Sequence, residues 1–121
     1  MAMANGTRAL VVTGDKRWRD HCVSTLINEG CEVDTASKGA QAFELCRKIP
    51  FDLIVVDESL PDYGPIETVL TLRDMFQHQP AVFVGGDNLE RFHNFWKRAQ
   101  VTFAGEKARV PDQVMSELSA S

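Results

Sequence analysis

The 121-residue sequence predicts an α/β fold: a three-layer, doubly wound sheet of five parallel strands with helices on both faces. Two observations lead to this prediction. Short apolar runs recur roughly every 20 to 25 residues. An amphipathic segment follows each run, which is typical of right-handed crossovers between parallel strands. A chain of this length builds one domain, which we expect at residues 8–119, after a disordered start at 1–7.

The first strand is expected at residues 9–12, where an uninterrupted apolar run indicates burial on both faces. Thr13 and Gly14 end this run. The helix that follows is expected at 15–29, because apolar side chains return every four positions, at Trp18, Cys22 and Leu26.

Alternating apolar and polar residues at 31–35 predict a strand near a sheet edge. Ser37 is expected to cap a helix that ends near Lys48. The segment at 51–57 is the clearest strand of the chain, and the continuous apolar run from Leu53 to Val56 favours a central position. It ends at the carboxylate of Asp57.

The second half of the chain repeats the pattern. Pro65 suits the first position of a helix at 65–76, and a strand is expected at 81–84. Asp87 is expected to cap a helix that carries Leu89 to Trp96. A weak fifth strand is expected at 101–104, and Pro111 opens the last helix.

Composition and charge exclude several classes of protein. Thirteen basic against 17 acidic residues give a net charge of −4, so no overall basic field would attract nucleic acid. No apolar run approaches the roughly 20 residues that span a bilayer, so no membrane association is expected. The three cysteines include no Cys-x-x-Cys pair, which argues against a disulfide framework and a zinc site and indicates reduced thiols in a cytoplasmic protein.

In open parallel sheets, chemistry takes place outside the carboxyl ends of the strands. The residues to consider are therefore those that follow the predicted strands: Thr13, Gly14 and Asp15, then Asp57, Gly85, Gly105, Glu106 and Lys107.

The chain resembles the receiver domain of two-component response regulators over residues 8–119. The most specific match is the segment FDLIVVDESLP at 51–61, an apolar run, an aspartate and an apolar-proline pair three and four residues later. Supporting matches are Leu10, Val11, Val12, Arg19, Gly30 to Val33, Ala36, Gly39, Ala42, Leu72, Arg73 and Pro80. The resemblance implies a flavodoxin-like topology.

The resemblance also implies roles for single positions. Asp57 holds the position of the aspartate that the family phosphorylates. The family binds Mg²⁺ with two adjacent acidic residues after strand one, but Thr13 and Gly14 stand there. Gly85 stands at the position of the switch hydroxyl, and Gly105 with Glu106 at that of the lysine, so neither position has the family's side chain. The position of the aromatic residue falls on Thr102, or on Phe103 if the register shifts by one.

These losses predict a degenerate receiver in which phosphotransfer to Asp57 is impaired. Asp15 and Lys107 are the candidate substitutes for the missing acid and the missing lysine, although Asp15 equally suits the start of a helix. We expect no metal and no other cofactor, unless Asp57 and Asp15 together still bind Mg²⁺.

The predicted helix around residues 89–96 carries more aromatic side chains than one buried stripe needs. Phe92 and Trp96 fit the core, whereas Phe95 lies off that stripe with Arg91 and Arg98 nearby. This mixture of an aromatic and basic side chains suits a protein contact. The resemblance implies a histidine kinase, a phosphotransfer protein or an output domain as the partner, or a second copy of the chain.

Three functions remain as hypotheses. The first is a non-enzymatic, receiver-like regulatory domain that acts through protein contacts. The second is a functional but atypical phosphoacceptor at Asp57. The third is a small flavodoxin-like enzyme or nucleotide binder, for which the sequence offers neither a phosphate-binding glycine loop nor a nucleophile with its base.

Overall fold

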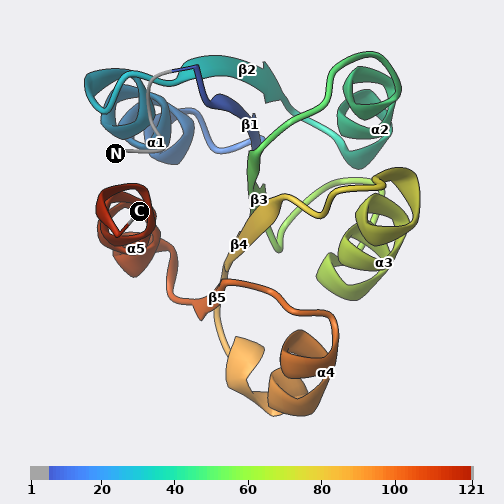
Figure 1. Ribbon diagram of the computed structural model, residues 1–121. Coiled ribbons are helices and arrows are strands. Elements are labelled where there is room, and N and C mark those ends of the chain that lie inside the picture. The colour runs from blue at the N-terminus through green and yellow to red at the C-terminus, as the bar shows by residue number, and fades with distance from the viewer. Residues whose placement is uncertain (1–5, 121) are drawn as a thin grey trace.

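Five parallel strands form one sheet in the order β2-β1-β3-β4-β5 (Figure 1). The computed structural model describes residues 6–120. The strands are β1 (Arg8–Val12), β2 (Glu32–Ala36), β3 (Leu53–Asp57), β4 (Ala81–Gly85) and β5 (Phe103–Gly105). The chain leaves β1 toward one edge of the sheet and returns through β3 toward the other, so the predicted doubly wound topology is confirmed.

The helices cover both faces of this sheet. They are α1 (Lys16–Asn28), α2 (Gly39–Lys48), α3 (Pro65–Met75), α4 (His93–Arg98) and α5 (Val110–Ser119), with single 3₁₀ turns η1 (Leu89–Phe92) and η2 (Lys107–Arg109). Figure 1 shows α1 and α5 on one side and α2, α3 and α4 on the other. None of the described helices is long and apolar enough to cross a bilayer.

The central strands read as unbroken apolar runs because both of their faces are buried. Ala9, Val11, Leu53, Val55 and Phe83 pack toward α1 and α5. The alternate residues Leu10, Val12, Ile54 and Val56 pack toward α2 and α3. The predicted stripe of α1 is confirmed, since Trp18, Cys22 and Leu26 are all buried.

The three cysteines are free and buried, as the sequence indicated. Burial raises the pKa of Cys22 to about 12 and that of Cys46 to about 11. Both thiols therefore stay protonated at neutral pH and behave as apolar core side chains.

The start of α2 differs from the prediction. Lys38, and not Ser37, holds the N-cap position, and no side chain of this segment caps the helix. Asp62, from the loop after β3, accepts hydrogen bonds from the backbone N of Gly39 at 2.9 Å and of Ala40 at 3.0 Å. A residue of another loop thus caps α2, which local sequence patterns do not reveal.

The segment after β4 also differs. The expected cap at Asp87 is wrong, because Asn88 holds the N-cap position with φ 57° and the chain forms η1 before α4 begins. Val101 donates its N–H to the Trp96 carbonyl at 3.0 Å, in the turn that closes α4 around Gln100 (φ 56°). The fifth strand therefore starts two residues later than predicted.

The segment 1–7 was predicted to be disordered, and residues 1–5 of it lie outside the described residues. Thr7 is 3% exposed, and its carbonyl accepts a hydrogen bond from Glu32 N at 2.9 Å. The packed structure thus includes Thr7 together with the predicted domain.

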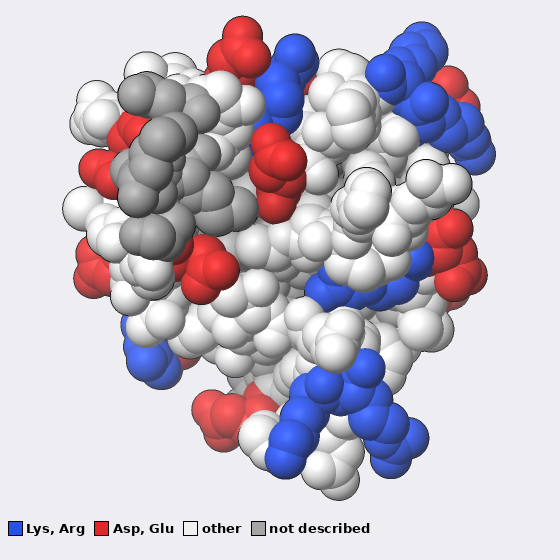
Figure 2. All heavy atoms as spheres, viewed as in Figure 1, with Lys and Arg blue, Asp and Glu red and all other residues white. Residues whose placement is uncertain are grey.

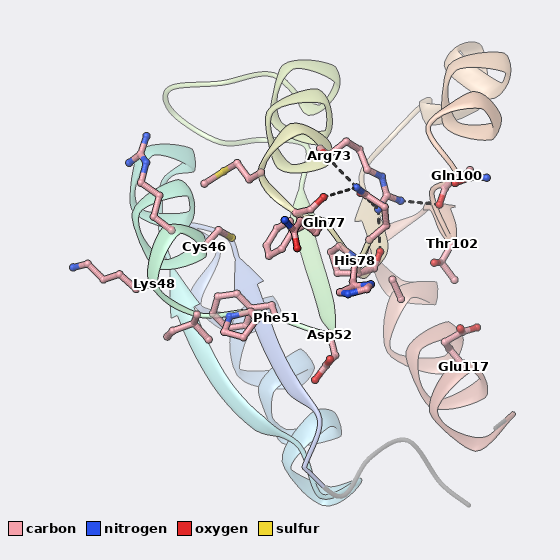
Figure 3. A pocket seen from close by; sticks show the side chains of 18 residues that line it. Cys46, Lys48, Phe51, Asp52, Arg73, Gln77, His78, Gln100, Thr102 and Glu117 are labelled. Carbon is pink, nitrogen blue, oxygen red and sulfur yellow. Dashed lines mark hydrogen bonds between the residues drawn. The ribbon is translucent and has the colours of Figure 1, made fainter.

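A groove of about 900 Å³ lies at the amino ends of the strands, at the opposite end of the sheet from Asp57 (Figure 3). Arg73 of α3 lines it and donates to the carbonyls of Ala99 at 2.8 Å, Pro80 at 3.0 Å and Gln100 at 2.7 Å. The bonds to Ala99 and Gln100 fix α3 to the turn that ends α4, and the bond to Pro80 fixes it to the segment before β4.

We predict that Asp62→Ala lowers the urea midpoint of unfolding more than Ser37→Ala does. Asp62 accepts two amides of the first turn of α2, whereas the Ser37 hydroxyl bonds only the exposed side chain of Gln41. Equilibrium unfolding of both variants tests this, and an equal or larger effect of Ser37→Ala would contradict the cap described above.

Candidate functional site

Asp57 stands at the carboxyl end of the central strand β3 and is 1% exposed. Its Oδ2 accepts hydrogen bonds from Thr13 Oγ1 at 2.6 Å and Lys107 Nζ at 3.1 Å. Its Oδ1 accepts the backbone N–H of Ser59 at 2.9 Å. Both carboxylate oxygens are therefore engaged within the protein.

Thr13 links the ends of β1 and β3. Its buried hydroxyl donates to Asp57 and accepts the backbone N–H of Asp15 at 3.0 Å. Gly14 beside it is exposed and contributes no side chain. At the two positions where the resemblance requires acidic residues, Thr13 therefore donates a hydrogen bond to Asp57, and Gly14 has no side chain to contribute.

Asp15 has two roles in the structure. As expected, it caps α1, since its Oδ1 accepts Trp18 N at 3.1 Å. Its Oδ2 accepts a hydrogen bond from Lys107 Nζ at 2.9 Å. The hydrogen bond from Lys107, followed by that from Trp18 N, lowers the pKa of the Asp15 carboxyl.

Lys107 follows β5 in the turn η2, and its Nζ bridges the carboxylates of Asp15 and Asp57. Burial disfavours its charge, but the hydrogen bonds to Asp15 and Asp57 outweigh this and raise the pKa of the ammonium. The structure thus brings the candidate substitute Lys107 to Asp57, although it lies two residues late in the aligned pattern.

Gly85, the position of the missing switch hydroxyl, pairs with Asp57 on β3 and with Gly105 on β5. A Cβ at Gly85 would lie 2.8 Å from Cζ2 of Trp18 and 3.1 Å from Cγ of Lys107. The indole of Trp18 therefore occupies the space that a side chain at Gly85 would need. The sequence analysis placed Trp18 in the core stripe of α1 but did not predict its contact with Gly85, because that contact joins residues far apart in the chain.

The two candidates for the aromatic position lie away from Asp57. Thr102 is exposed and lines the groove at the amino end of the sheet. Phe103 is partly buried against the core under α1 and α5, with the guanidinium of Arg109 5.3 Å from its ring centroid. By contrast, the indole of Trp18 in α1 lies beside the site, with its ring centroid 4.8 Å from Lys107 Nζ.

The residues present do not fit the Mg²⁺ ion that the resemblance implies. Mg²⁺ requires several oxygen ligands in near-octahedral geometry. Thr13 and Gly14 supply no carboxylate, and the Lys107 ammonium lies between the two acids that remain, Asp15 and Asp57. Among residues 6–120, no group of three or more His, Cys, Asp or Glu side chains could hold a metal ion.

Hydrogen bonds tie together the loops around Asp57. Glu58 donates its N–H to the Gly85 carbonyl at 2.9 Å, and its Oε1 accepts the N–H of Asp87 at 2.7 Å. Gly86 donates to the carbonyl of Gly105 at 2.9 Å. The segments after β3, β4 and β5 are thus connected to one another beside the site.

The predicted interaction face on η1 and α4 is basic and only partly apolar. Arg91 and Arg98 are exposed, and Figure 2 shows basic side chains gathered over α4 at the bottom of the view. Phe95 is partly buried, with its ring centroid 5.1 Å from that of the buried Trp96. The expected contrast between a buried Phe92 and an exposed Phe95 is wrong, because both rings meet Trp96 edge-on.

Comparisons with known proteins concern the family and the fold of the chain. A family model described as the response regulator receiver domain matches residues 9–101. A search of curated proteins gives no significant match.

Several solved structures share the fold. The chemotaxis response regulator CheY4 of Vibrio cholerae has a TM-score of 0.80 at 22% identity, over 96% of this chain and 98% of that one. A CheY-like receiver domain from Methylobacillus flagellatus has 0.79 at 18%, over 96% and 98%. A two-component response regulator from Clostridium difficile has 0.80 at 16%, over 94% and 93%.

We predict that Lys107→Met lowers the free energy of unfolding by roughly 1–3 kcal/mol, because it deprives the buried Asp57 carboxylate of its charged donor. Lys97→Met is the matched control, since Lys97 is exposed on α4, and its effect should stay within about 0.5 kcal/mol. Urea unfolding measures both. Equal effects of the two substitutions would show that the contact with Asp57 contributes nothing to stability.

The same comparison extends to pH. The folded-state pKa of Lys107 is raised above 10.5, so its stabilisation is fully present below that pH and is lost as pH rises through the folded value. The stability difference between the wild type and Lys107→Met should therefore shrink above pH 10.5. Ionisation of other groups occurs in both proteins and cancels in the difference. A stability difference that grows at alkaline pH would contradict the raised pKa of Lys107.

Proposed function

Because the chain belongs to the response regulator receiver domain family, we propose that it is a regulatory domain of cytoplasmic two-component signalling that acts through protein contacts and in which phosphorylation of Asp57 is impaired. On this proposal the domain is not an enzyme. The small flavodoxin-like enzyme or nucleotide binder has no support from the family assignment.

The observation that carries this proposal is the state of the Asp57 carboxylate. To accept a phosphoryl group, one of its oxygens must approach phosphorus in line with the leaving group. Oδ2 already accepts the Thr13 hydroxyl and the Lys107 ammonium, and Oδ1 accepts the Ser59 amide. Since only 1% of Asp57 is exposed, a phosphoryl donor can reach a carboxylate oxygen only if the groups packed around it move.

Charge supports the same conclusion. A transferring phosphoryl group brings further negative charge, which receivers with two acidic residues neutralise through a bound cation. Among the described residues, the cation bonded to Asp57 is Lys107, which Asp15 shares. The Lys107 ammonium, which could otherwise neutralise a phosphoryl group, is therefore already paired with two carboxylates.

The position of Lys107 also favours the second candidate function, an atypical phosphoacceptor. Its Nζ lies 3.1 Å from Asp57 Oδ2, within reach of a phosphoryl group attached there. If Asp15 released the ammonium, Lys107 could bind a phosphoryl oxygen. This function differs from the first in a measurable way, because it requires a covalent adduct at Asp57.

The contact surface that we propose is the basic part of η1 and α4. Arg91 and Arg98 are exposed there, and the net charge of the chain is −4, so this basic surface is local. It suits an acidic surface on a histidine kinase, a phosphotransfer protein, an output domain or a second copy of the chain.

We predict no stoichiometric phosphorylation when the protein is incubated with acetyl phosphate and Mg²⁺ and its intact mass is recorded. Asp57→Asn serves as the control for modification at other sites. A stoichiometric adduct in the wild type that is absent in Asp57→Asn would overturn the impaired-phosphorylation proposal and establish the atypical phosphoacceptor.

We also predict that Arg91→Glu combined with Arg98→Glu weakens binding to the histidine kinase or phosphotransfer protein of the same organism by roughly tenfold or more. The matched control is Lys16→Glu with Arg17→Glu, an equal charge change at exposed positions of α1. Isothermal titration calorimetry measures both. Equal losses from the two pairs would indicate a general charge effect and not a contact at α4.

A further inference from the structure

We propose that the Asp57 site is a built-in lock, in which the ammonium of Lys107 takes the place of a bound cation and the indole of Trp18 takes the place of a side chain at Gly85. The lock holds the carboxyl ends of β1, β3, β4 and β5 in one arrangement. This inference rests on the proposed function, in which phosphorylation does not switch the domain. It names the contacts that occupy the places of the family's metal ion and switch hydroxyl.

The first part of the lock is the pairing of one ammonium with two carboxylates. Lys107 Nζ lies 2.9 Å from Asp15 Oδ2 and 3.1 Å from Asp57 Oδ2. Because Lys107 belongs to the chain, this pairing is intramolecular and does not depend on the concentration of a free ion. The two acids are thus neutralised in part whether or not a divalent cation is present.

The second part is the indole of Trp18, which holds Lys107 at both ends. Trp18 Nε1 donates to the backbone carbonyl of Lys107 at 2.9 Å. The Lys107 ammonium lies 4.8 Å from the centroid of the indole ring, at a distance that suits a cation–π contact. Asp15 holds Trp18 in turn by accepting its backbone N–H. Asp15, Trp18 and Lys107 therefore form a closed ring of contacts.

The third part is the absence of a side chain at Gly85. A Cβ there would lie 2.8 Å from one ring carbon of Trp18, a separation that Cβ atoms essentially never show, and 3.0 Å from a second. The indole in this position and a hydroxyl-bearing side chain at Gly85 therefore exclude each other. The glycine at position 85 thus removes the switch hydroxyl and also leaves the space that the Trp18 indole fills.

The lock extends to the proposed contact surface. The Gly85 carbonyl accepts Glu58 N, and Glu58 Oε1 accepts Asp87 N just ahead of η1 and α4. Trp96 Nε1 of α4 donates to the carbonyl of Leu89 in η1 at 2.7 Å. A displacement of Gly85 would therefore reach the segment that carries Arg91 and Phe95.

A double-mutant cycle between Trp18 and Gly85 tests the packing part of the lock. Gly85→Ser should raise the unfolding equilibrium constant roughly tenfold or more, because the new side chain meets the indole. Gly14→Ser is the matched control and should change that constant by less than about twofold, since a Cβ at Gly14 meets only the Ser37 carbonyl at 3.8 Å.

The cycle is completed with Trp18→Leu, which shortens the side chain that fills the space. Trp18→Leu combined with Gly85→Ser should be destabilised by much less than the sum of the single substitutions. Additive effects, or a Gly85→Ser protein as stable as Gly14→Ser, would overturn the proposal.

Backbone relaxation dispersion measures exchange between conformations of the folded protein, which a change in the free energy of unfolding alone would not produce. The lock predicts that amides of residues 85–98 occupy one state in the wild type, with flat profiles that Mg²⁺ and beryllofluoride leave unchanged. Lys107→Met should produce exchange at these amides, while Lys97→Met should leave the profiles of 85–92 flat. Exchange between two states in the wild type, or flat profiles in Lys107→Met, would overturn the proposal.

The outcomes separate this inference from the proposed function. An Asp57-dependent phosphoryl adduct together with strong Trp18–Gly85 coupling would overturn impaired phosphorylation but retain the packing arrangement. No adduct together with additive effects at Trp18 and Gly85 would overturn the lock and leave the proposed function standing.

Discussion

The structure of the site depends on one ammonium group that two carboxylates share. Asp57 ends a strand that is buried on both faces, so its charge lies where water cannot solvate it well. The donors come from three separate segments: the Thr13 hydroxyl after β1, the Ser59 amide after β3 and the Lys107 ammonium after β5. Satisfying one buried carboxylate thus joins the carboxyl ends of strands across most of the sheet, and Asp15 extends the same network to the start of α1.

This arrangement explains why several departures from the family pattern occur together. With Thr13 and Gly14 in place of acids, the carboxylates that remain at the site are those of Asp15 and Asp57, and Lys107 bridges them. With glycine at position 85, the indole of Trp18 lies against β4 and holds the backbone of Lys107. In combination these residues form a hydrogen-bonded, closely packed site.

The helix α4 is held from two directions, which bears on its proposed role as a contact surface. At its carboxyl end, Arg73 of α3 binds the carbonyls of Ala99 and Gln100, a favourable place for a cation because helix carbonyls point there (Figure 3). At its start, Trp96 binds the carbonyl of Leu89, and the loop before η1 is tied to Glu58 beside the site. A surface anchored in this way presents Arg91 and Arg98 from a fixed backbone, so less conformational freedom is lost when a partner binds.

The sequence alone determined the fold class, the order of the strands' apolar runs, the buried stripe of α1, the helix cap at Asp15 and the place of Asp57 at a strand end. These features follow from local periodicity, because strands buried on both faces need continuous apolar residues and an amphipathic helix repeats every 3.6 residues. Only the tertiary structure decided that Asp62 caps α2, that Phe92 and Phe95 share Trp96, and that Lys107 and Trp18 close the site. Each of these contacts joins segments whose separation depends on turn lengths and sheet register, as between Asp15 and Lys107, 92 residues apart. The fifth strand starts two residues later than its apolar run indicated, and the turn after it brings the ammonium of Lys107 to the carboxylate of Asp57.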